Sequence, residues 1–309
     1  MSHTPLPRRA LLAGAALLAS PAVLRAQTPV LRVANQRGGL RSLLEASGLA
    51  SDLPFRIEWY EFPAAQPLLE ALNAYAIDVG SMGDLNFFNV FSSGAPIKAI
   101  SATRSDGASQ AVVARPGAGI ADAAGLRGKR IAAARGGWTH YSLLRILEKQ
   151  GLAPGDVSIA WLLPADAALA LRSGAVDAWS VWEPFTSLEI LEFQASLVAD
   201  ARGLTPSASF LAAHDHALRD KAPLLKELSD RVARGWDWAR GNIPDYARAT
   251  ATLLRQPVPV LERAYRVNDT RAIPIDEAAI AEWQEAADKA QGFGVIPRPL
   301  KVAEAIHRL

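Results

Sequence analysis

The sequence contains no cysteine among its 309 residues. This absence excludes disulfide bonds, thiolate metal sites and a lipid anchor on an N-terminal cysteine. Long apolar runs are scarce too, because the run at residues 10–24 is about 15 residues long and a membrane span needs about 20. The chain also lacks the Gly-x-Ser-x-Gly, His-Glu-x-x-His and Walker-type motifs. The sequence therefore contains no strong catalytic motif and predicts no metal site or cofactor.

The N-terminus has the organisation of an export signal. Arg8 and Arg9 precede the apolar run, and small residues mark a cleavage site after Ala26. We therefore expect residues 1–26 to be a Sec or twin-arginine signal, and the mature protein to be periplasmic. Those residues hold three of the 33 basic side chains and none of the 31 acidic ones, so the remainder carries 30 against 31, a net charge of −1. Such a chain is not expected to bind nucleic acid.

Strand-like and helix-like segments alternate from residue 31 to about residue 200, after which helices dominate. The expected strands are residues 31–34, 55–62, 77–79, 97–101, 130–134, 157–162 and 178–181, and the expected helices are residues 40–49, 66–73, 85–91, 139–150, 165–171 and 185–193. This alternation predicts an α/β fold with mainly parallel sheets flanked by helices. The length favours two lobes, with residues 27–112 and 213–309 forming lobe I and residues 113–212 forming lobe II. The chain would cross between lobes at residues 111–115 and 209–213.

Three loops share one construction, in which a strand ends, small residues follow and a helix begins. They are residues 78–84, 134–140 and 179–184. The start of a helix offers unpaired N–H groups and a partial positive charge, which together stabilise an anion. Loops of this kind meet at the carboxyl ends of strands in α/β sheets. The pattern therefore predicts a cleft that binds an anion.

These loops also carry a resemblance to a known family. The segments that carry it are residues 58–63, 68–73, 77–81, 83–84, 136–144, 164–167 and 176–184. In this order they resemble the substrate-binding proteins of ABC importers for sulfonates, taurine and nitrate, and most closely the aliphatic sulfonate-binding type.

The resemblance implies a type II periplasmic binding protein, with two α/β lobes joined by a two-segment hinge. It implies a monomer that captures a small sulfonate-like anion and delivers it to an ABC transporter permease in the inner membrane, with no enzymatic activity. It also implies a set of ligand-binding residues on four loops, in chain order residues 36–37, 81–84, 136–140 and 182–183. That set is Gln36, Arg37, Ser81, Met82, Gly83, Asp84, Gly136, Gly137, Trp138, Thr139, His140, Trp182 and Glu183.

The chain departs from the sulfonate-binding pattern at several of these positions. Met82 stands where a threonine is usual, Trp138 where a serine is usual, and Glu183 replaces an aspartate. A ligand with a bulkier or aromatic tail that stacks on Trp138 or Trp182 is therefore one hypothesis. Taurine, nitrate or an aryl sulfonate are alternative ligands. An enzyme on the same scaffold, of the pyrimidine-precursor or menaquinone-route type, is one alternative function, and a ligand-loaded sensor partner for a membrane receptor is another.

Overall fold

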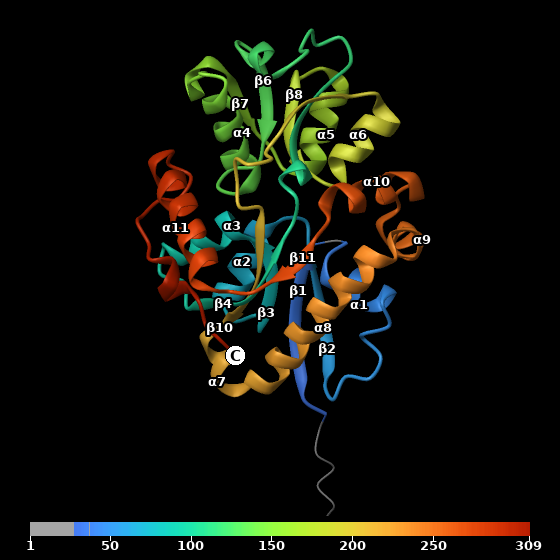
Figure 1. The fold of residues 1–309 in the computed structure, drawn as a ribbon, viewed down its shortest axis with the longest axis vertical. Helices are drawn as coiled ribbons and strands as arrows, with labels where there is room; N and C mark the ends of the chain where they lie inside the picture. Colours follow the sequence, from blue (N-terminus) through green and yellow to red (C-terminus); the bar gives the residue numbers. More distant parts are fainter. Residues whose placement is uncertain (1–27, 37) are drawn as a thin grey trace, which may run out of the picture.

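Two sheets organise the protein, and a computed structural model describes residues 28–36 and 38–309. The predicted export signal, residues 1–26, lies outside the described residues. The first sheet has the order β11-β4-β10-β3-β1-β2. Its strands are β1 (Val30–Gln36), β2 (Arg56–Phe62), β3 (Val79–Gly83), β4 (Ile97–Arg104), β10 (Ala208–His214) and β11 (Arg271–Ile273). We call this sheet and its helices lobe I, the lower part of Figure 1.

The second sheet has the order β7-β6-β8-β5-β9 and forms lobe II, the upper part of Figure 1. Its strands are β5 (Gln110–Ala114), β6 (Arg130–Ala133), β7 (Ser158–Trp161), β8 (Ala178–Trp182) and β9 (Ser196–Asp200). Both sheets are mixed. In lobe I, β10 and β11 run against the other four strands, and in lobe II, β5 alone runs against the rest. The predicted α/β fold is confirmed, with antiparallel pairs inside largely co-directional sheets.

Helices cover both faces of each sheet. Lobe I contains α1 (Leu40–Ala46), α2 (Ala65–Asn73), α3 (Asp84–Phe91), α7 (Asp215–Asp220), α8 (Ala222–Gly241), α9 (Ile243–Leu254), α10 (Val258–Asn268) and α11 (Glu277–Gly292). Lobe II contains α4 (Trp138–Lys149), α5 (Pro164–Ser173) and α6 (Phe185–Phe193). Short 3-10 turns are η1 (Gly107–Ser109), η2 (Ala123–Leu126), η3 (Pro154–Asp156) and η4 (Val302–Ala305). Proline occupies the first turn of α8, α9 and α10, where its missing N–H is no loss.

The apolar core follows the alternation of side chains along the strands. In β5, Val112 packs into a cluster with α4, whereas Val113 packs on the opposite face against α5. The cluster around α4 is continuous with the core of lobe I, where it includes Phe87 and Phe88 of α3. The two lobes therefore share apolar packing where α3 and α4 meet.

The chain changes sheets between Arg104 and Gln110, and returns between Asp200 and Ala208. The crossings expected at residues 111–115 and 209–213 instead form β5 and β10, because an apolar extended segment reads the same whether it connects lobes or pairs within a sheet. The two crossing segments contact each other: the Ser105 N–H donates to the Ser207 carbonyl at 3.0 Å.

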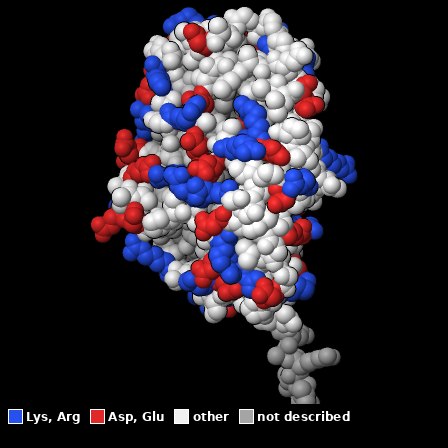
Figure 2. Space-filling view, turned by 45° about the vertical axis from the view of Figure 1, so that its right-hand side comes forward, with Lys and Arg blue, Asp and Glu red and all other residues white. Residues whose placement is uncertain are grey.

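Charges are interleaved on the surface. On the face drawn in Figure 2, basic and acidic side chains alternate and form no continuous patch of one sign. This distribution agrees with the near-zero charge of residues 27–309.

One buried ion cluster holds β1 against β3. The carboxylate of Asp78 is fully buried and lies 2.7 Å from both the Arg32 guanidinium and the Lys221 ammonium. It also accepts the Arg32 backbone N–H at 2.7 Å. Burial alone would raise the pKa of Asp78, but the hydrogen bonds from Arg32 and Lys221 outweigh it and lower that pKa.

We expect Asp78→Ala to destabilise the protein by about 3–5 kcal/mol, because it leaves two cations without their partner. Since the folded pKa lies below the unfolded one, the stabilisation is present above the unfolded pKa and is lost as pH falls through the folded pKa. Urea unfolding of wild type and variant between pH 3 and pH 7 measures this. A difference in stability that stays constant over that range would contradict the linkage.

Candidate functional site

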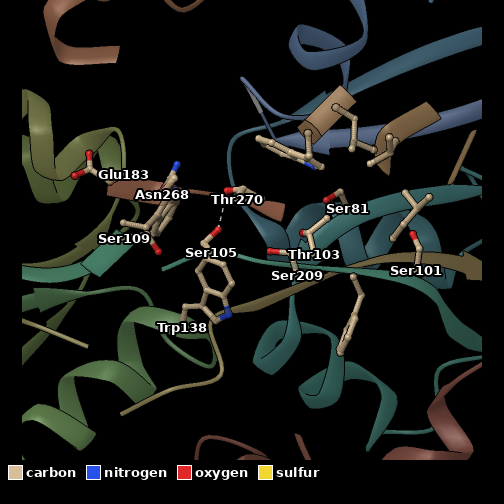
Figure 3. Close-up of a pocket in the computed structure, with 16 residues that line it drawn as sticks. Ser81, Ser101, Thr103, Ser105, Ser109, Trp138, Glu183, Ser209, Asn268 and Thr270 are labelled. Atoms are coloured by element: carbon tan, nitrogen blue, oxygen red, sulfur yellow. Dashed lines mark hydrogen bonds between the residues drawn. The ribbon is translucent and has the colours of Figure 1, made fainter. Parts of the chain in front are cut away.

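A cavity of about 150 Å³ lies between the lobes (Figure 3). From lobe I it is lined by Leu40, Ser81, Ser101, Thr103, Ser105, Ser209, Phe210, Leu211, Val232, Trp236, Asn268 and Thr270, and from lobe II by Ser109, Trp138, Trp182 and Glu183. Among these described lining residues none is a lysine or an arginine. The wall thus consists of hydroxyl groups, three indoles, one amide, one carboxylate and four other apolar side chains, those of Leu40, Phe210, Leu211 and Val232.

The strand register explains why the hydroxyls gather. Ser81 of β3 and Ser101 of β4 both pair with the same residue of β10, and Ser209 of β10 pairs with Thr103 of β4. Neighbours in register place their side chains on one face of a sheet. Among the described residues these four hydroxyls have no hydrogen-bond partner, so they are free to meet a ligand.

Three further hydroxyls line the cavity, and two of them, those of Ser105 and Ser109, lie where the chain crosses between lobes. Ser105 and Thr270 are hydrogen-bonded to each other at 2.9 Å, as the dashed line in Figure 3 shows. The Ser109 hydroxyl is buried without a partner in the described structure. An unpaired buried hydroxyl is costly, which suits a group that waits for a ligand.

Four predicted site residues line this cavity: Ser81, Trp138, Trp182 and Glu183. The structure thus brings together one residue of the second loop, one of the third and two of the fourth. Whether each contacts a ligand stays a prediction.

The other residues of the second loop lie beneath the cavity wall. Met82 is buried in the apolar core of lobe I. Gly83 lies directly under Trp138, since a methyl group added there would come within 2.8 Å of the indole. Asp84 is fully buried and accepts hydrogen bonds from the Trp138 Nε1–H and the Leu85 N–H, both at 2.6 Å. Burial raises the pKa of Asp84 to about 7.

The remaining residues of the third loop build the start of α4. Gly136 has a φ of +77°, a conformation that favours glycine. Gly137 is the N-cap residue and is buried. The Thr139 hydroxyl lies 3.1 Å from the backbone N of Ala134, from which it accepts a hydrogen bond. All three shape the loop, and the cavity lining does not include them.

His140 packs away from the cavity. Its ring meets the edge of Trp161 at 4.6 Å between centroids. Burial, and then the charge of Arg135, lower the pKa of His140 to about 4. The histidine is therefore neutral at the pH of most solutions, and its contacts serve packing.

The first loop contributes less than expected. Gln36 ends β1, and its carbonyl accepts the Gly39 N–H at 2.9 Å, which turns the chain toward α1. Gln36 is not among the lining residues, whereas Leu40 of α1 is. Arg37 lies outside the described residues.

Glu183 joins the lobes at the edge of the cavity. Its carboxylate accepts the Ser187 N–H at 3.0 Å and pairs with Arg263 of α10 at 3.2 Å. Burial raises the pKa of Glu183, and the bonds to Ser187 and Arg263 oppose that shift. The start of α6 therefore already carries a negative group of the protein itself.

Most of the hydroxyl-bearing residues that line the cavity were not predicted from the sequence. The signal was present along β4 and in the residue that follows it, because Ser101, Thr103 and Ser105 recur at every second residue and so share one face of an extended segment. Asn268, Thr270 and Trp236 lie far along the chain, and only the tertiary fold brings them to the cavity.

In residues 28–36 and 38–309, no three His, Asp or Glu side chains are grouped so that they could hold a metal ion. Within the same residues, no helix combines the length and apolar character that a membrane crossing needs.

The fold and the cavity define a protein of the two-lobe binding class, in which a ligand site lies between lobes. The chain belongs to the NMT1/THI5-like family, whose profile matches residues 62–247.

Several relatives of the chain are named as sulfonate-binding proteins. A protein of Escherichia coli (strain K12) named as an aliphatic sulfonates-binding protein is 27% identical over 301 residues, which is 96% of this chain and 94% of the relative. The alkanesulfonate-binding protein SsuA from Xanthomonas axonopodis pv. citri, solved bound to MOPS, superposes with a TM-score of 0.83 at 27% identity, over 92% of this chain and 100% of that one. The periplasmic aliphatic sulphonate binding protein SsuA from Escherichia coli gives a TM-score of 0.81 at 25% identity, over 91% and 93%.

An enzyme also shares the fold. The desulfurization enzyme DSZB superposes with a TM-score of 0.65 at 17% identity, over 91% of this chain and 96% of that one. At this identity the similarity shows the fold alone.

The buried carboxyl of Asp84 makes stability depend on pH. Its folded pKa of about 7 lies above the ordinary aspartate value of 3.8. The contribution of Asp84 to the free energy of unfolding is therefore complete below pH 4 and is lost as pH rises through 7. The loss is on the order of 4 kcal/mol.

We expect Asp84→Asn to remove this loss, since the amide still accepts both hydrogen bonds but never ionises. Urea unfolding of both proteins between pH 4.5 and pH 8 measures the difference in slope. His140 contributes the opposite slope below pH 6.5 in both proteins, so only their difference is informative. Parallel curves would contradict the assignment.

Proposed function

We propose that this protein binds a small organic sulfonate between its lobes and delivers it to the permease of an ABC importer. The named relatives support the ligand class. The observation that carries the proposal is the row of unpartnered hydroxyls of Ser81, Ser101, Thr103 and Ser209.

The chemistry of that wall suits a sulfonate. A sulfonate is the anion of a strong acid, with three acceptor oxygens and no proton to donate, so a site made of donors suits it at any ordinary pH. Each hydrogen bond to a charged group contributes about 1.5–3 kcal/mol. Four such bonds, less the cost of ordering, reach the ~8 kcal/mol of micromolar binding.

We infer that the protein is not an enzyme. The carboxyl group of Asp84 accepts hydrogen bonds from an indole and a backbone amide, and Glu183 is held by Arg263 and a backbone amide. Neither carboxyl is poised to take a proton from a ligand in the cavity. Incubation with sulfonates followed by mass spectrometry of the small molecules tests this, and release of sulfite would favour the enzyme.

The cellular setting belongs to the same proposal. Residues 1–26 would direct export and be removed, leaving a monomer in the periplasm that meets its permease with the ligand enclosed. Contacts from a ligand to both lobes would stabilise the shut form relative to an open one.

We expect ethanesulfonate to bind with micromolar affinity, and Ser209→Ala and Thr103→Val each to weaken binding by about 10- to 100-fold, since each removes one hydrogen bond to a charged group. Isothermal titration calorimetry measures both. Ser173→Ala, at an exposed position on α5, is the matched control and should bind as wild type does. Taurine, nitrate and benzenesulfonate complete the panel, and a wild-type protein that binds nitrate but no sulfonate would overturn the proposal.

A further inference from the structure

One hydrogen bond links the starts of α3 and α4, which belong to different lobes. The Trp138 Nε1–H of lobe II donates to the Asp84 Oδ1 of lobe I at 2.6 Å. Asp84 has no exposed surface, and its Oδ2 has no hydrogen-bond partner in the described structure. Losing the indole would remove a hydrogen bond that holds this buried carboxyl, which is costly.

Glycines bring the two helix starts into direct contact. A methyl group on Gly83 would lie 2.8 Å from Nε1 and Cε2 of Trp138, and one on Gly137 would lie 2.1 Å from Nδ2 of Asn86. At Gly83 a side chain would collide with the indole, and at Gly137 it would force the Asn86 amide to move. The indole therefore rests on bare backbone on one side while Asp84 holds its N–H, so its orientation is fixed from two directions.

The fixed indole forms a wall of the cavity and limits its size. The cavity measures about 150 Å³. A cavity of that volume holds about one benzene ring, so a sulfonate group with a short tail fills it. A sulfonate joined to a long chain or a ring needs more room inside. Without the Trp138 side chain the cavity would be larger by about the volume of an indole.

We propose that Asp84 is a positioning residue that holds the Trp138 indole as the wall limiting the ligand's tail, so that the site selects short sulfonates over long or ring-bearing ones. This inference rests on the proposed function. It replaces the hypothesis that an aromatic tail stacks on Trp138, because the indole takes up the space that such a tail needs.

The test compares the affinities of ethanesulfonate and octanesulfonate by calorimetry. We expect wild type to prefer ethanesulfonate by at least tenfold, and Trp138→Ala to reduce that preference at least fivefold by admitting the longer tail. Asp84→Leu, which keeps the size of the side chain but cannot accept a hydrogen bond, should shift the preference in the same direction. Asp84→Asn, which still accepts it, should return the preference towards that of wild type, and Ser173→Ala should match wild type.

A second measurement does not depend on any ligand. In protein labelled with 5-fluorotryptophan, the fluorine resonance of Trp138, assigned from its absence in Trp138→Phe, should be single and sharp in wild type and Asp84→Asn. It should shift and broaden in Asp84→Leu. If Asp84→Leu does not fold, the smaller Asp84→Ala, which also cannot accept the hydrogen bond, takes its place in both measurements.

The two proposals fail differently. An unchanged fluorine resonance or an unchanged preference in Asp84→Leu, or in Asp84→Ala where that variant replaces it, would overturn the positioning role even if sulfonates bind. Failure of wild type to bind any sulfonate, with the resonance behaving as expected, would overturn the ligand class and leave the positioning of the indole standing.

Discussion

Strand β10 returns from lobe II and pairs between β3 and β4, and the ligand cavity depends on this placement. Its antiparallel register brings Ser209 beside Thr103, and puts Ser81 and Ser101 on either side of a shared partner. The same return lays the two crossing segments against each other through Ser105 and Ser207. One strand therefore both assembles the hydroxyl wall and forms the junction about which the lobes are joined.

The fold was largely predictable from the sequence, because local patterns of apolar residues indicate the strand and the helix of each strand–helix unit. The expected helix of residues 185–193, for example, is α6 with the same bounds. The strands β5 and β10 were not recognised as such, because pairing with strands far along the chain is invisible in a local pattern. The same limit explains the site: Trp138 and Trp182 lie in recognisable loops, but Asn268 and Thr270 reach the cavity only through tertiary packing.

The sequence predicted that the helix starts bind the anion. Two of them instead bind carboxyl groups of the protein itself. At α3 the Leu85 N–H is bonded to Asp84, and at α6 the Ser187 N–H is bonded to Glu183. A resident carboxylate satisfies the same amides and the same positive end of the helix that a ligand would use. The hydroxyls of the lobe I sheet are therefore left as the main donors, and hydroxyls can rotate to follow an anion's oxygens in a way that fixed amides cannot.

Burying those carboxyl groups also affects the balance between open and shut lobes in the proposed cycle. Asp84 bonds to Trp138 and Glu183 to Arg263, each across the lobes, whereas the exposed pair of Lys289 and Glu148 contributes little. Burial raises the pKa of Asp84 to about 7. Its desolvation therefore offsets part of the stabilisation that the hydrogen bond from Trp138 provides. Contacts between the ligand and both lobes must supply the difference, and for this reason an empty cavity favours the shut form less than a filled one does.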